Sequence, residues 1–182
     1  MTKRQVFYSF HFDNDSWRAG QVKNMGVVEG NTPVSPNEWE EVKKNGDEQI
    51  KKWINDTMYY KSCVVVLIGS ETASRKWCKY EIEHAWRSGK GVVGVYIHGL
   101  KNSIQQQSVK GKNPFELFYI DKTMNHIVEC DYPHDCLEVK MSTVCKAYDT
   151  PYNNSENVYS YIYNHIKDWV EEAIMIRNKY PK

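Results

Sequence analysis

The sequence lacks three features that would assign it to a specialised class of protein: a long apolar run, an excess of charge of one sign, and paired cysteines. No run of about 18 apolar residues occurs anywhere, and the opening MTKRQVFYSFHFDND has no apolar stretch of signal-peptide length. The sequence therefore predicts a soluble, cytoplasmic protein with no membrane partner. Its 24 basic and 23 acidic residues give a net charge of +1, which does not favour nucleic acid as a partner.

The five cysteines form no CxxC pair, which is typical of a reducing compartment rather than of a disulfide framework. One stretch of the chain gathers His126, Cys130, His134, Cys136 and Cys145. Their spacing fits no familiar arrangement of zinc ligands. The favoured interpretation is a set of ordinary, partly buried cysteines, and no metal is predicted.

What is present is an alternation of strand and helix patterns within 182 residues, a length suited to one domain. Apolar, β-rich runs predict strands at 5–10, 63–70 and 91–99, and helical spacing of apolar residues predicts helices at 13–25, 47–58 and 74–86. Asp13 to Ser16 are expected to cap the first helix. This order favours an α/β fold in which helices cover a parallel sheet.

The second half of the chain has weaker signals. Residues 100–118 are expected to form a long polar loop that closes with a short helical turn after Pro114. HIVEC at 126–130 is a candidate strand, and at most one short strand is expected between 26 and 42. A long terminal helix is predicted from about 155 to 176, with Asn154 or Ser155 as its cap.

Three glycines, Gly89, Gly91 and Gly94, match the spacing of the dinucleotide-binding fingerprint. That fingerprint follows a strand and opens a helix, so that the helix N-terminus faces a pyrophosphate. Here the glycines follow a predicted helix and enter a predicted strand. They therefore predict a tight helix-to-strand turn rather than a phosphate-binding loop.

Two glutamates in SRKWCKYEIEHAW, residues 74–86, differ in their surroundings if the segment is helical. Glu81 projects among apolar residues such as Trp77 and Ile82, whereas Glu83 shares its side of the helix with lysines and Arg87. One interpretation of Glu81 is structural: the carboxylate gains from the helix dipole or pairs with an arginine such as Arg18. The other is functional, because a poorly hydrated carboxylate stabilises positive charge that develops on a substrate.

The loops at 9–15 and 69–74 both leave the carboxyl ends of predicted parallel strands. Ligands of open α/β sheets bind at that edge, and Glu81 lies on the helix that follows the second loop. We expect a cleft there whose wall includes Ser9, Phe10, His11, Asp15, Ser70 and Trp77.

Together VFYSFHFDND, VVVLIGSETASRKWCKYEIEHAW and GKGVVGVYIH resemble a TIR domain, and more narrowly the bacterial TIR-like branch that includes the ThsB proteins of Thoeris anti-phage defence. The most specific part is SxxWCxxE, formed by Ser74, Trp77, Cys78 and Glu81. The resemblance implies a flavodoxin-like TIR fold, with a central parallel sheet flanked by helices. It divides the chain into a TIR-like core at 1–118 and an extension at 119–182 whose terminal helix packs on the core; pairing of this helix with another subunit and a role in sensing infection are left open.

The resemblance also implies an activity. In enzymatic TIR domains the glutamate at the position of Glu81 is catalytic and cleaves the nicotinamide glycosidic bond of NAD+, which is the substrate, so no cofactor or metal is expected. Thoeris-like members make a cyclic ADP-ribose-type nucleotide that diffuses to a partner effector. A phage-derived trigger and a homo-oligomer are left open. The alternatives are a non-catalytic TIR assembly module and a plain NAD hydrolase that acts as a toxin.

Overall fold

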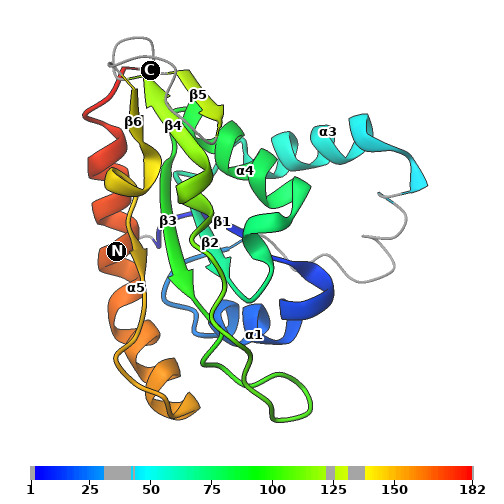
Figure 1. Ribbon diagram of the computed structural model, residues 1–182, viewed down its shortest axis with the longest axis vertical. Helices are drawn as coiled ribbons and strands as arrows, with labels where there is room; N and C mark the ends of the chain where they lie inside the picture. Colours follow the sequence, from blue (N-terminus) through cyan, green and yellow to red (C-terminus); the bar gives the residue numbers. More distant parts are fainter. Residues whose placement is uncertain (1–2, 31–41, 43, 122–125, 131–137, 182) are drawn as a thin grey trace.

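The computed structural model describes residues 3–30, 42, 44–121, 126–130 and 138–181. Its main sheet is parallel and four-stranded, in the order β1 (Val6–Ser9), β2 (Cys63–Ile68), β3 (Gly91–Tyr96) and β7 (Ala147–Tyr148). All six residues of β2 are buried, as the continuous apolar run CVVVLI requires of a strand covered on both faces. The predicted α/β fold is confirmed (Figure 1).

The helices form a layer on each face of the main sheet. On one face α1 (Phe12–Asn24) and α5 (Ser155–Arg177) share a core with alternate strand residues, among them Tyr8 and Val65. On the other face α3 (Asp47–Met58) and α4 (Lys76–Arg87) pack against the residues between these, such as Phe7 and Val64. Side chains on either side of β1 and β2 therefore belong to different cores, because successive strand residues point to opposite faces.

The terminal helix α5 lies directly against the sheet. The Asn154 side chain caps it by accepting bonds from Glu156 N at 2.9 Å and Asn157 N at 3.3 Å, which confirms the predicted cap. A Cβ on Gly91 would come within 2.8 Å of the backbone nitrogen of Ile174, so the close approach of α5 to β3 requires glycine there.

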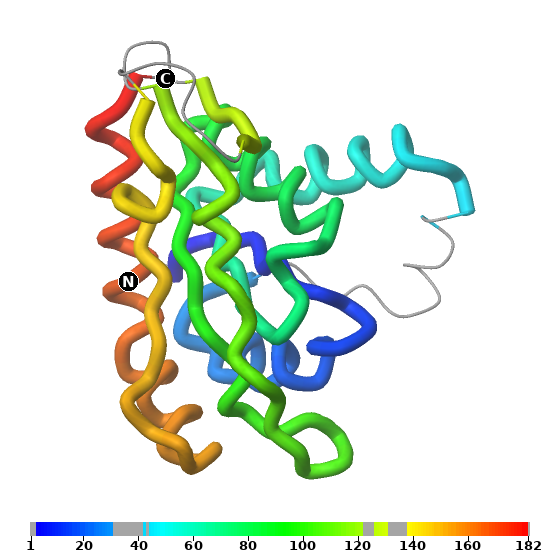
Figure 2. The backbone as a smooth tube through the Cα atoms, in the orientation of Figure 1, coloured from blue at the N-terminus to red at the C-terminus, as the bar shows by residue number. Residues whose placement is uncertain are grey.

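The segment leading to α5 runs beside this helix in the opposite direction (Figure 2). Tyr148 of β7 stacks on Trp169 of α5, with ring centroids 4.5 Å apart. The division into a core at 1–118 and an extension at 119–182 stays a prediction, but the fourth strand of the main sheet comes from the later part of the chain.

A second, antiparallel sheet has the order β5 (His126–Glu129), β4 (Phe118–Asp121) and β6 (Glu138–Lys140). It confirms the candidate strand at 126–130. The structure also has three short 3-10 helices: η1 (Thr72–Ser74), η2 (Pro114–Leu117) and η3 (Met141–Thr143). Of these, η2 is the helical turn predicted after Pro114.

The start of α1 differs from the prediction. The helix begins at Phe12, its N-cap is His11, and no side-chain capping bond is present, so capping by residues from Asp13 to Ser16 is wrong. Asp13 and Asp15 lie instead in the first turn, where the positive end of the helix dipole stabilises carboxylates.

The region 26–42 shows one isolated bridge, between Gln5 and Glu29, and its residues 31–41 lie outside the described part. Gly89 has φ +73° and turns the chain from α4 into β3, as predicted for the glycine-rich stretch. No helix in the described ranges has the length and apolar character needed to cross a membrane.

Candidate active site

Glu81 lies on α4 behind the carboxyl ends of β1 and β2. Only 7% of the residue is exposed, and no ion pair joins its carboxylate to another described residue. Burial raises the pKa of Glu81 from its ordinary 4.5 to about 8, and the nearby Ser9 hydroxyl opposes this by a smaller amount. The arc predicted from the sequence is confirmed, because the buried side of α4 also includes Cys78, Ile82 and Ala85.

Glu83, two residues away, has the opposite environment. It forms an ion pair with Arg87, at 2.6 Å between Oε1 and Nη2, on the outer side of the same helix. The two glutamates thus differ as the helical pattern predicts, and Glu83 is a natural control for Glu81.

Ser9 is the last residue of β1 and is 1% exposed. Its hydroxyl has no hydrogen bond of good geometry to any described group, although it lies close enough to lower the pKa of both Glu81 and Cys78. Burial, and then the neighbouring Glu81 charge, raise the pKa of the Cys78 thiol, which therefore stays protonated. The site thus contains a buried acid, a hydroxyl available for a hydrogen bond and an unreactive thiol.

Asp15 forms the second buried carboxylate of this edge, and its partner is Arg18. Asp15 Oδ1 lies 3.0 Å from Arg18 Nη1, and both side chains are almost fully buried. Burial raises the pKa of Asp15 while the Arg18 guanidinium opposes that rise. Arg18 is therefore not the partner of Glu81, and this rules out that ion pair as the structural explanation of Glu81.

Arg18 also joins two loops of the site edge. Its guanidinium donates to the carbonyl oxygens of Leu100 at 2.8 Å and Gln106 at 3.0 Å, in the loop after β3, and to Asn14 at 3.3 Å. Four hydrogen bonds, counting the one to Asp15, satisfy this buried charge. Arg18 thus fixes the start of α1 against the loop that follows β3.

Two glycines allow the loop after β2 to pack against both neighbours. A Cβ on Gly69 would lie 2.0 Å from Asp15 Oδ2, and a Cβ on Gly111 would lie 2.0 Å from Gly69 O. The backbone approaches are so close that no larger residue fits without a shift. The start of α1 and the loops after β2 and β3 therefore meet around Gly69.

His11 is 8% exposed and faces acidic groups. Its Nδ1 lies 3.7 Å from Glu71 and its Nε2 lies 3.8 Å from Asp13. Burial lowers the pKa of His11, as does the charge of Arg75, while the surrounding carboxylates oppose both effects. The imidazole is therefore mostly neutral at pH 7.

The remaining predicted wall residues lie in other surroundings. Phe10 packs with the core that α1 and α5 share, on the other face of the sheet from Glu81, and the Lys23 ammonium lies 4.7 Å from its ring centroid. Trp77 is partly buried on α4 and contacts Tyr80 edge-on. Ser70 is partly buried in the loop after Gly69, and its carbonyl oxygen faces Gly111.

Buried polar atoms without partners gather at this edge. Among the described residues, such side-chain atoms occur in Ser9, His11, Asp15, Arg75, Trp86, His98 and Ser108. All but Trp86 lie at the carboxyl ends of β1, β2 or β3 or in the segments that follow them. Because native proteins pair nearly all buried polar groups, water or a ligand is expected to supply the missing partners at this edge.

The described residues contain no cluster of three or more His, Cys, Asp or Glu side chains that could hold a metal ion. His134 and Cys136, which the sequence analysis considered as zinc ligands, lie outside the described part. Cys145 is buried, and burial raises the pKa of its thiol. The chemistry that this edge offers is that of carboxylates and a hydroxyl.

A parallel sheet covered on both faces, with a buried acid behind its carboxyl edge, is the architecture expected of an α/β domain of the TIR type. The family model described as "Thoeris protein ThsB, TIR-like domain" matches residues 7–102, which is more than half of the chain. The chain therefore belongs to the family of ThsB TIR-like proteins of the Thoeris system.

A curated relative from Bacillus cereus (strain MSX-D12) carries the name "Putative cyclic ADP-D-ribose synthase ThsB1". It is 36% identical over 121 residues, which are 64% of this chain and 62% of the relative. The match thus spans less than two thirds of the relative's length. The family model covers the segments 9–15 and 69–74, and together with this relative it confirms the family resemblance drawn from the sequence.

Proposed function

We propose that this protein cleaves the bond between nicotinamide and ribose in NAD+ and converts the remaining ADP-ribose into a cyclic nucleotide. The observation that carries the proposal is the environment of Glu81: a buried carboxyl group, bound to no guanidinium, at the edge where parallel sheets bind ligands. The name of the Bacillus cereus relative supports the same chemistry.

The reaction needs negative charge beside the ribose. As the bond from C1′ to the nicotinamide nitrogen breaks, its electron pair leaves with the ring, which becomes neutral, and the ribosyl carbon becomes an oxocarbenium-like cation. No proton has to be supplied to the leaving group. A carboxylate fixed in a poorly hydrated site stabilises the cation more strongly than one in water.

Because the pKa of Glu81 is raised, its ionisation depends on whether the substrate is bound. With a pKa of about 8, Glu81 is largely protonated at pH 7 in the empty protein. The bound nicotinamide ring carries a positive charge, which favours the ionised carboxylate. Substrate binding therefore helps to produce the charge that catalysis requires.

The other residues of the edge have supporting roles in this proposal. The free hydroxyl of Ser9 is placed to bond to the carboxylate or to a ribose hydroxyl. His11 and Asp15 form the wall beside it, and Arg18 holds the loops in place. Phe10, Ser70 and Trp77 stay proposed wall residues.

In cells the cyclic product would carry a signal. We place the protein in anti-phage defence, where infection triggers synthesis and the nucleotide activates a separate effector protein. Its membership in the ThsB family supports this setting. Attack on C1′ by a group of the same ADP-ribose molecule gives the cyclic product, and attack by water gives linear ADP-ribose; in both cases the attacking group loses a proton to solvent.

The proposal is tested by mass spectrometry of nucleotides from cells that express the wild type, Glu81→Gln or Glu83→Gln, with and without phage. We expect NAD+ loss and a cyclic ADP-ribose isomer in infected cells with the wild type and Glu83→Gln, and neither with Glu81→Gln. Linear ADP-ribose alone would identify a plain hydrolase. Normal defence by Glu81→Gln without NAD+ loss would identify a non-catalytic assembly module.

A further inference from the structure

A pocket lies at the amino-terminal end of β1, at the opposite end of that strand from the Glu81 site. Its walls come from Lys3 and Arg4 ahead of β1, the turn at 25–28 after α1, and one side of α5. Its volume is about 530 Å³, within the range of small-molecule sites. Nothing in the proposed reaction uses it.

The pocket has one acid, which is paired with Arg4, and two further cations, of which Lys167 lies near enough to Glu171 to help lower its pKa. Arg4 binds Glu171 with two parallel bonds, Nε to Oε1 at 2.6 Å and Nη2 to Oε2 at 2.9 Å. No ion pair or hydrogen bond joins Lys3 or Lys167 to any described residue. Three cationic side chains against one carboxylate leave a local charge of +2, although the whole chain carries only +1.

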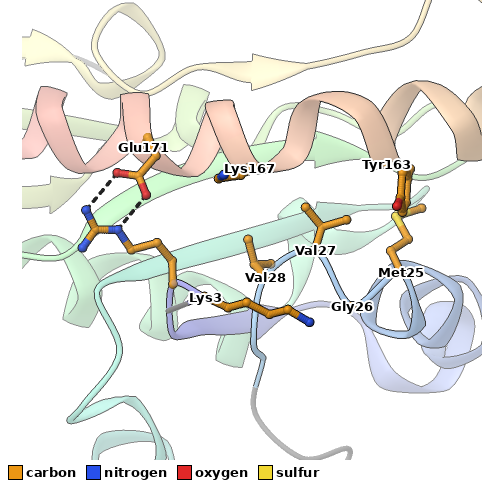
Figure 3. Close-up of a pocket in the computed structure, with 9 residues that line it drawn as sticks. Lys3, Met25, Gly26, Val27, Val28, Tyr163, Lys167 and Glu171 are labelled. Carbon is orange, nitrogen blue, oxygen red and sulfur yellow. Dashed lines mark hydrogen bonds and ion pairs between the residues drawn. The ribbon is translucent and has the colours of Figure 1, made fainter. Parts of the chain in front are cut away.

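The floor and the far end of the pocket are apolar and aromatic. Figure 3 shows Glu171 at one end, Val27 and Val28 in the middle, and Tyr163 at the other end. Tyr163 is 48% exposed, so its ring is open to a ligand. Glu171 and Tyr163 are eight residues apart on α5, which at 1.5 Å per residue gives the pocket a length of about 12 Å.

We propose that this pocket binds a small ligand in which a phosphate group adjoins a flat, apolar part, as in a nucleoside phosphate. Two unpaired ammonium groups attract a phosphate as point charges. The valine floor and the open tyrosine ring suit the flat part, which gains from burial and stacking. An acidic peptide would satisfy the lysines, but it would leave the apolar floor and the tyrosine unused.

The test uses AMP as the probe and the full chain as the protein. Calorimetry compares the wild type with the double variant Lys3→Gln/Lys167→Gln, and hydrogen exchange locates the bound AMP. A matched control, Lys52→Gln/Lys179→Gln, removes the same charge from exposed positions elsewhere. Because AMP is not cleaved, the result does not depend on whether Glu81 is catalytic.

We expect AMP to protect residues 25–28 and 163–171 and to bind at least tenfold more weakly to the pocket variant, with the control unchanged. Adenosine and inorganic phosphate, which each lack one part, should bind more weakly than AMP. Protection confined to 9–15 and 69–81, or equal affinity for the pocket variant, would overturn the proposal. Tighter binding of a polyglutamate peptide than of AMP would show that the occupant is an acidic protein segment and would likewise overturn it.

Discussion

Replacing Glu81 by glutamine should make the protein more stable at high pH, because Glu81 must lose its proton inside the protein. Its pKa is about 8 in the folded state against an ordinary 4.5. Between these values the folded state holds a proton that the unfolded state has released, so the free energy of unfolding falls as pH rises. At about 1.36 kcal/mol per pH unit the full effect is roughly 5 kcal/mol, and relaxation around the charge reduces it to about 3 to 5 kcal/mol.

The assay is urea unfolding of the wild type and Glu81→Gln at several pH values. Near pH 5 both side chains are neutral, and the two proteins should agree within about 1 kcal/mol. Above pH 8 the variant should be more stable by the amount derived above. Glu83→Gln, on the exposed side of α4, should show no such pH-dependent gain. A difference between Glu81→Gln and the wild type that is the same at all pH values would refute the burial argument.

Three other predictions concern the reaction, the loops and the packing of α5. In an NAD+ cleavage assay, kcat/KM should rise with pH up to about pH 8 and then level off, because the free protein must ionise Glu81; a flat profile would contradict this. Arg18→Met should lower the free energy of unfolding by about 3 to 5 kcal/mol and speed hydrogen exchange at 100–106, since Asp15 loses its partner; unchanged exchange would show that Arg18 does not hold the loop. Gly91→Ala should cost about 1 to 3 kcal/mol in urea unfolding, because its Cβ meets the backbone of α5, and a neutral result would mean that the helix shifts freely.

Three strands of the main sheet and the covering helices could be predicted because their signals are local. The run CVVVLI and the spacing of Ile50, Ile54 and Met58 each indicate one element without reference to the rest of the chain. The burial of Glu81 was also predictable from a local pattern, since Glu81 shares one side of the helix with Cys78 and Ile82.

The contacts at the site edge could not be predicted from local signals, because they join distant parts of the chain. The carbonyl oxygens that Arg18 binds are 82 and 88 residues away, and no periodicity marks them. The glycines at 69 and 111 gave no signal as a pair, because each is required by the backbone or carboxylate of another loop. The cap of the first helix was assigned wrongly for a different reason: several residues in DNDS can cap a helix, and local chemistry does not choose among them.

Nicotinamide release from NAD+ by extracts of infected cells measures the role of Glu81 most directly. The wild type and Glu83→Gln should release it at similar rates, and Glu81→Gln should be slower by at least about 100-fold, as expected when a preorganised charge is removed. Equal rates for Glu81→Gln and the wild type, at equal protein levels, would contradict the assignment of this carboxylate to the reaction.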